Sequence, residues 1–154
     1  MTAKTKFFGE VELDDNKILE FPNGIIGFEE YKHYAILYDT DKEDETGISW
    51  LQSLDEPSLA LPVVDPFAII SEYAPRIEDE LLKPLNHATD EDLIVLLVLT
   101  VPSDMTKVTA NMKAPIIINA KERKGVQLVV DNADYPVKFN VYESVQKMKE
   151  KAGE

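Results

Sequence analysis

The sequence contains no cysteine in its 154 residues. This absence excludes disulfide bonds, thiolate nucleophiles and cysteine-based zinc sites, and it fits a reducing cytoplasm. Long apolar runs are also lacking, since the longest, at residues 93–99, is far shorter than the roughly 20 residues that span a bilayer. The N-terminus shows no long apolar stretch of the kind found in secretory signals. We therefore expect a cytoplasmic protein with no membrane partner.

Basic residues are scarce as well. The chain has 16 Lys and Arg residues against 29 Asp and Glu residues, which gives a net charge of −13. An acidic surface repels phosphate groups, so direct binding of nucleic acid is disfavoured. Acidity often serves solubility alone; if this charge concerns a partner, that partner should be basic. The same charge favours a monomer when the protein is free.

Hydrophobic residues recur with a period of two, which is typical of β-strands. Short runs of this kind, separated by turn residues, predict a mostly β fold: a small antiparallel β-barrel-like single domain with one or two short helices. Residues 93–101 are apolar on both faces and should form a central strand, and Pro115 should start a strand or lie on an edge. The predicted strands cover residues 5–14, 17–21, 33–39, 48–54, 59–65, 93–101, 115–119 and 126–132.

Two segments are predicted to be helical. Residues 75–85 begin with a proline that suits a first helical turn, and Pro84 should end that helix. Residues 141–151 form the second, and an isolated helix this short needs a docking surface on its own body or on a partner. We therefore divide the chain into a β-barrel-like domain at residues 1–141 and an amphipathic tail at 142–154. The side chains expected along one face of the tail helix are Tyr142, Val145, Met148 and Lys149.

The acidic run DTDKEDE invites a metal-binding interpretation. Asp39, Asp41 and Glu43 alternate in it as ligands do in calcium-binding loops. However, Asp44 stands where an EF-hand needs glycine, and Trp50 stands where the bidentate glutamate belongs. We predict no bound metal.

Catalytic motifs are not apparent either. The GIIG sequence at residues 24–27 is followed by Glu29 and Glu30 instead of the basic residues that phosphate or RNA would need. His33 and His87 lie far apart in sequence, and no serine lies in a GxSxG elbow. A pair of the many carboxylates could still converge for acid–base chemistry. We predict no enzyme activity and no cofactor, with a small carboxylate-based enzyme as a rival hypothesis.

Recognition of another protein is the remaining function class. Several aromatic residues occupy loop-like positions, where they either plug an open barrel end or anchor a partner on a rim. The stretch FPNGIIGFEEY at residues 21–31 is interpreted as a rigid turn and short helical corner. In it Pro22 fixes φ, and Gly24 and Gly27 supply unusual backbone conformations. The aromatic residues are Phe28, Tyr31, Phe67, Tyr73 and Tyr135.

An ordered set of motifs runs along most of the chain. They are FPNGIIGFEEY at 21–31, WLQSLDEPSLALPVVDPF at 50–67, DLIVLLVLTVP at 92–102, TANMKAPIIINAKERKGVQLVVDN at 109–132 and the DY pair at 134–135. In this order the motifs resemble the family of bacterial flagellar assembly factors called FliW. Lys113 departs from the pattern, because an apolar residue is expected between TAN and API. The edge at Lys113 should therefore be more exposed.

The resemblance implies a small β-barrel-like protein without enzyme activity that binds two alternative partners. One is CsrA, a small, basic, dimeric RNA-binding protein that represses flagellin translation, and the other is flagellin, held through its C-terminal helical region before export. Free flagellin would occupy the protein; once flagellin is secreted, the protein would sequester CsrA at a site distinct from the RNA surface. The alternative is a flagellin-specific export chaperone without a regulatory role.

The stretch after the VDPF motif combines apolar residues with carboxylates in a turn-rich region. Such a combination suits a partner-facing surface. The opposite interpretation also stands at this point: Asp65 caps a turn and Phe67 fills the core. The predicted partner-binding residues are Asp65, Phe67, Glu72 and Tyr73, with Glu78 and Asp79 adding charge.

Overall fold

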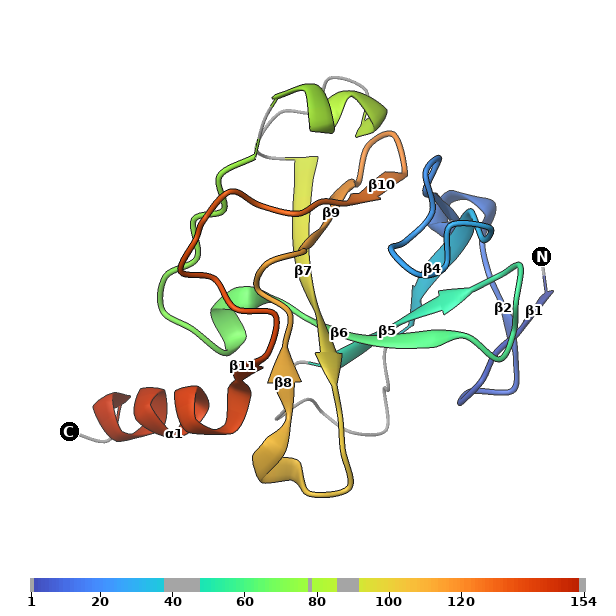
Figure 1. Cartoon of the computed structure of the whole chain (residues 1–154). Coiled ribbons are helices and arrows are strands. Elements are labelled where there is room, and N and C mark those ends of the chain that lie inside the picture. The colour runs from blue at the N-terminus through green and yellow to red at the C-terminus, as the bar shows by residue number, and fades with distance from the viewer. Residues whose placement is uncertain (1, 38–47, 78, 86–91, 153–154) are drawn as a thin grey trace.

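The computed structural model describes residues 2–37, 48–77, 79–85 and 92–152. Its main sheet runs in the order β11, β8, β7, β6, β5, β4, β3, β10, β9, and an additional pairing of β7 with β9 closes part of it into a barrel (Figure 1). The strands are β3 (Leu19–Glu20), β4 (His33–Leu37), β5 (Ile48–Ser53), β6 (Ala60–Val64), β7 (Leu93–Thr100), β8 (Thr109–Ala110), β9 (Ile116–Asn119), β10 (Lys124–Gln127) and β11 (Phe139–Asn140).

Strand β7 holds the two parts of the fold together. Along one edge its first four residues pair with β9 and its last two pair with β8, while Leu97 and Val98 pair with β6 on the other edge. Among the described residues, all strand pairs of the main sheet are antiparallel except β3 with β10. The predictions of a mostly β, antiparallel barrel and of a central strand at residues 93–101 are thus confirmed.

The barrel interior is filled by side chains that alternate with outward-facing residues along each strand. Its largest members, Phe21, Tyr34 and Leu51, are fully buried. A second apolar cluster lies below the β7–β8 end and includes Ile69, Leu97 and Val108 among others. A third, around Leu85, Ile117, Val126 and Leu128, lies beneath the short 3-10 helix η3 (Asp79–Leu85).

The N-terminus differs from the predicted strand at residues 5–14. A separate two-stranded sheet forms from β1 (Thr2–Lys4) and β2 (Glu10–Glu12), and the residues between them turn. Gly9 has φ +66° in this turn, a conformation that would interrupt a continuous strand. The short 3-10 helix η1 (Asp15–Lys17) then leads into β3.

The helix predicted at residues 75–85 is wrong in its first half and in its type. Of the described residues in this range, those of Asp79–Leu85 are helical, as a 3-10 helix that contains Pro84. The residues before it bond to a distant segment instead: Arg76 N–H donates to Asn132 Oδ1 at 2.6 Å, and the Arg76 carbonyl accepts from Asp131 N–H at 3.0 Å. Because these tertiary bonds occupy the backbone, local helix signals do not decide its conformation.

The tail does form a helix, α1 (Val141–Ala152), which extends away from the barrel (Figure 1). Asn140 Oδ1 caps it by accepting from Glu143 N–H at 2.9 Å. Val141 and Val145 pack against the second cluster, whereas Tyr142 is 44% exposed. The docking face is therefore offset from the predicted one. The side chains of Met148 and Lys149 lie outside the described residues, and the division of the chain at residue 141 stays a prediction.

The stretch FPNGIIGFEEY forms successive tight turns, and no helical segment is assigned in it. The expected unusual conformations are present, with φ +70° at Gly24 and +89° at Gly27. A side chain at Gly24 would also place its Cβ 2.5 Å from Glu29 Cα, so only glycine fits. The expected helical corner is wrong, because Gly24 and Gly27 interrupt the helical conformation.

Candidate partner-binding surface

Asp65 and Phe67 lie at the corner where β6 ends. Asp65 Oδ1 accepts a hydrogen bond from Phe67 N–H at 2.8 Å and so caps the 3-10 helix η2 (Pro66–Ala68). The capped turn displays Phe67, whose side chain is 58% exposed. Asp65 therefore does cap a turn, as one of the two interpretations held, but Phe67 is at the surface and does not fill the core.

Tyr73 is a core residue. Its ring stacks on that of Tyr135 with 5.0 Å between centroids, and its hydroxyl donates to the Met112 carbonyl at 2.7 Å. Only 8% of the residue is exposed, and this burial raises the pKa of the Tyr73 phenol above its ordinary value. The structure thus places Tyr73 beneath the surface on which we expected it, because an aromatic ring with a bonded hydroxyl is more stable inside.

Asn132 fixes the chain that leads away from Tyr73. The buried Asn132 side chain accepts from Arg76 N–H and donates to the Ala74 carbonyl at 3.1 Å. Lys113 Nζ donates to the Asn132 carbonyl at 2.8 Å, so this lysine is half-buried and has a structural role. The expectation of a more exposed edge at Lys113 is therefore wrong, because its ammonium group bonds inward.

Glu72 lines a hollow between the segment at residues 70–72, β11 and α1. The hollow has a volume of about 350 Å³, and its floor is apolar, with Ile70, Met112 and Phe139. Glu72 and Lys147 place one charge of each sign on it. A neighbouring hollow of about 400 Å³ shares Phe139, Ser144 and Lys147, so the two form one continuous surface, which we call the α1 groove.

The six predicted residues do not converge on this groove. Asp79 begins η3, at the upper end of the view in Figure 1, whereas α1 lies at the lower end. The side chain of Asp79 and all of Glu78 lie outside the described residues. The sequence analysis did not identify Met112, Phe139 and Lys147 as lining the groove. These residues are far from Glu72 in sequence, and no local pattern indicates that they lie close to it.

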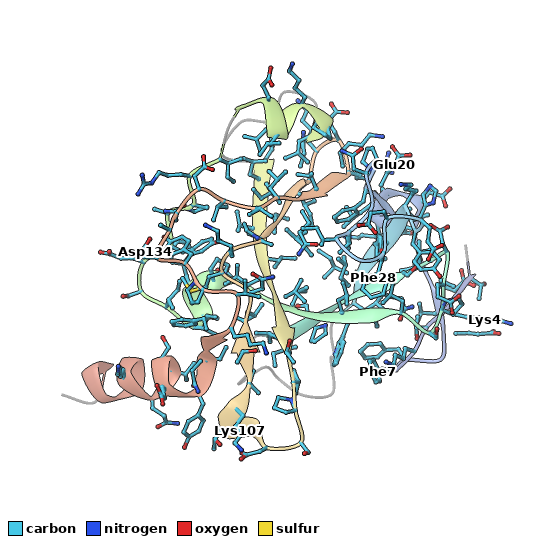
Figure 2. The ribbon with its side chains drawn as sticks, viewed as in Figure 1. Lys4, Phe7, Glu20, Phe28, Lys107 and Asp134 are labelled. Carbon is cyan, nitrogen blue, oxygen red and sulfur yellow. The ribbon has the colours of Figure 1, made fainter. Side chains whose placement is uncertain are left out.

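The other loop aromatics mostly act as plugs. Phe28 and Tyr31 pack against the barrel core, and Tyr135 packs against the second cluster. Sequence reasoning did not single out Phe7, which is 52% exposed and contacts the Trp50 ring at 4.4 Å between centroids. Figure 2 shows Phe7 on the side of the molecule opposite α1. Phe7 is therefore not part of the α1 groove.

Asp55 joins two segments of the chain through hydrogen bonds at the start of β4. His33 Nδ1 lies 3.3 Å from both oxygens of Asp55, which also accepts from Lys32 N–H at 2.8 Å and His33 N–H at 3.0 Å. Burial raises the pKa of Asp55, but these hydrogen bonds outweigh it, so the net pKa lies below its ordinary value. The acidic run at residues 39–45 and His87 lie outside the described part of the chain.

Within that described part, no group of three or more His, Asp or Glu side chains is placed to hold a metal ion. No helix there is long and apolar enough to cross a membrane. What the geometry offers is a surface: an exposed aromatic ring at a capped corner and, beyond it along the chain, an apolar groove with charged groups. Such a surface suits protein recognition.

The model of the family described as FliW protein matches residues 2–141. The chain belongs to the FliW family. The flagellar assembly factor FliW of Lachnoclostridium phytofermentans is 54% identical over 146 residues, 95% of this chain and 94% of the relative. That of Lachnospira eligens is 47% identical over 148 residues, 96% and 98% of the two chains.

A crystal structure of the flagellar assembly factor FliW shares the fold. It matches with a TM-score of 0.83 and 31% sequence identity, over 92% of this chain and 97% of that chain. The resemblance to FliW noted in the motifs is thereby confirmed. FliW proteins are flagellar assembly factors and do not form a known enzyme family.

Proposed function

We propose that this flagellar assembly factor works in the cytoplasm by binding two proteins in turn, flagellin and a CsrA-type translational repressor. The observation that carries the proposal is membership of the FliW family over nearly the whole chain. In this scheme the protein has no catalytic activity and acts by stoichiometric binding. Flagellin awaiting export occupies it; after export the free protein binds the repressor and antagonises it allosterically, so flagellin translation resumes.

Charge supports the choice of a basic partner. A net charge of −13 attracts a basic RNA-binding dimer and repels its RNA, so the protein competes poorly for RNA itself. Such complementarity accelerates encounter more than it tightens the final complex. The antagonism therefore needs apolar contacts as well as charge.

The α1 groove supports the choice of a helical partner. It has an apolar floor at Ile70, Met112 and Phe139 that continues into the neighbouring hollow, and amphipathic helices commonly bind with their apolar face in such grooves. Glu72 at the groove and the exposed Phe67 three residues before Ile70 supply a charge and an aromatic anchor. We place partner binding on this surface and let the two partners compete for it.

Calorimetric titration of the full chain with a CsrA dimer, and separately with flagellin, tests the proposal. Saturable binding of both is expected. The variant Glu72→Lys should weaken binding by about tenfold, or about 1.4 kcal/mol, since it replaces an attractive charge at the surface by a repulsive one. The control Glu122→Lys makes the same charge change at the exposed turn between β9 and β10, far from α1 (Figure 1), and should bind normally.

Three results would count against parts of this proposal. Equal affinity of Glu72→Lys and the wild type would remove the α1 groove as the site. Binding of flagellin without CsrA would leave an export chaperone with no regulatory role. Heat with neither partner would refute both functions.

A further inference from the structure

A second groove lies far from α1, where the FPNGIIGFEEY turn faces η3. The turn places its two neighbouring isoleucines in opposite directions: Ile25 is 2% exposed and packs in the barrel core, whereas Ile26 is 53% exposed. A single exposed apolar side chain is common on protein surfaces, so the significance of Ile26 depends on the apolar hollow beside it.

The turn holds Ile26 rigidly. Its own N–H donates to Gln127 Oε1 on β10 at 3.0 Å, and Gly27 N–H donates to Glu29 Oε1 at 3.1 Å. Two further backbone bonds, from Gly24 to Phe21 at 2.8 Å and from Phe28 to Ile25 at 2.7 Å, close the turns on either side. Because the anchor is ordered before a partner arrives, binding to it loses little conformational entropy.

The space beside Ile26 is a hollow of about 300 Å³ between the turn, η3 and β10, which we call the η3 groove. Val126 and Leu128 form a buried apolar floor, and Leu81, 39% exposed, stands on η3 as the second lip. The groove thus has an apolar floor and two exposed apolar lips. A side chain of leucine size fits such a site.

The charged side chains that line the η3 groove are acidic, and Lys32 and Lys83 lie beside them without lining it. Glu29 and Glu80 line it, and the lining contributed by the described residues includes no lysine or arginine. The hydrogen bond from Gly27 N–H holds the pKa of Glu29 below its ordinary value, so Glu29 is ionised at neutral pH. Lys83 approaches Glu80 at 3.6 Å, but both side chains are highly exposed, and such pairs are weak.

We propose that the η3 groove is a second docking surface, for a basic segment of a partner protein that carries one or two large apolar anchors. The apolar anchor enters between Ile26 and Leu81, and lysine or arginine side chains beside it pair with Glu29 and Glu80. This surface goes beyond the proposed function, because it lies on different elements from the α1 groove. The mixed charge at the α1 groove gives no comparable preference for a basic ligand.

The test uses the full chain and a fluorescein-labelled synthetic peptide of 14 residues, made of leucine and lysine at helical spacing. A matched peptide replaces every lysine with glutamate. Fluorescence anisotropy at low salt should show saturable binding of the lysine peptide and at least tenfold weaker binding of the glutamate peptide. Raising the salt should weaken the first interaction, since the pairs are at the surface.

Protein variants separate docking in the groove from general attraction to an acidic protein. Ile26→Ser leaves the charge unchanged and should weaken binding about tenfold, as expected for losing one buried apolar contact. Its control, Ile94→Ser, changes an isoleucine that is 40% exposed on β7 and should bind normally. Glu80→Lys should weaken binding several-fold more than Glu10→Lys, which makes the same charge change on β2.

Equal affinities of wild type and Ile26→Ser would overturn the proposal, as would equal losses in Glu80→Lys and Glu10→Lys. Concentration-dependent dimerisation that Ile26→Ser abolishes would overturn it too, since the occupant would then be a second copy of the chain. Glu72→Lys should weaken peptide binding no more than Glu10→Lys does, so the result is independent of whether the α1 groove binds flagellin or CsrA. Urea unfolding of each variant checks that its fold is intact.

Discussion

Removing the hydroxyl groups of two buried tyrosines, one at a time, should change the stability of the fold in opposite directions. The Tyr73 hydroxyl donates to the Met112 carbonyl at 2.7 Å. Tyr73→Phe loses that bond and leaves a buried carbonyl without this donor, so we expect a loss of about 1–2 kcal/mol in the free energy of unfolding. The ring remains stacked on Tyr135, and the packing term is unchanged.

Tyr34 presents the contrary case inside the barrel. Its side chain is fully buried and meets Phe21 edge-on at 5.2 Å, but its hydroxyl finds no hydrogen-bonding partner among the described residues. Burial raises the pKa of Tyr34 to about 12, so the group is neutral. Tyr34→Phe removes a polar group that is dehydrated without compensation, and should raise the free energy of unfolding by about 1–2 kcal/mol.

Urea denaturation followed by Trp50 fluorescence measures both variants against the wild type. Unchanged m-values would show that the midpoints report stability, and the two variants should differ by about 2–4 kcal/mol in total. In thermal melts each kcal/mol corresponds to about 2–4 °C for a chain of this size. If Tyr34→Phe loses as much stability as Tyr73→Phe, the Tyr34 hydroxyl is bonded and the reasoning about the barrel interior is refuted.

Two further predictions concern the turns. Gly24→Ala places a Cβ at φ +70° and 2.5 Å from Glu29 Cα, and should lower the free energy of unfolding by about 2–4 kcal/mol. Gly27→Ala has φ +89° but open space around the new Cβ, and should lower it by about 1–2 kcal/mol. Thermal melts that rank the two variants the other way would contradict the turn geometry. The pKa of Asp55 is lowered from 3.8 in the folded state, so its carboxylate stabilises the fold above that pH and the contribution disappears as the pH falls through and below it. Asp55→Asn should therefore be less stable than the wild type at pH 6, and the difference should shrink as the pH falls from 3.8 through the lowered pKa of the folded state. A difference independent of pH in urea titrations would be the contrary result.

The β-strands of the barrel are predictable because burying one face of a strand makes apolar and polar residues alternate along it. This alternation is visible in the sequence without knowing which strands pair. β7 is the clearest example: its continuous apolar run predicts a central strand, and it pairs with β6 on one edge and with β8 and β9 on the other. The helix at residues 75–85 fails for the opposite reason. The backbone at Arg76 bonds to Asn132, which lies too far along the chain for any local pattern to indicate.

The candidate site was predictable only in part. An acidic residue before Pro66 indicates a cap, and Asp65 is one, but burial of Tyr73 and exposure of Phe67 depend on what packs against each ring. Both grooves are assembled from segments distant in sequence. Unusual backbone at Gly24 was predictable from its residue type, whereas the outward direction of Ile26 became visible only in the structure.

The central claim is that one protein is occupied by two partners in alternation. Size-exclusion chromatography tests it directly: a complex of the chain with a CsrA dimer is isolated, an excess of flagellin is added, and the fractions are assayed for all three proteins. The account predicts that flagellin co-elutes with the chain and that CsrA is released. Co-elution of all three proteins, or retention of CsrA with flagellin free, would contradict it.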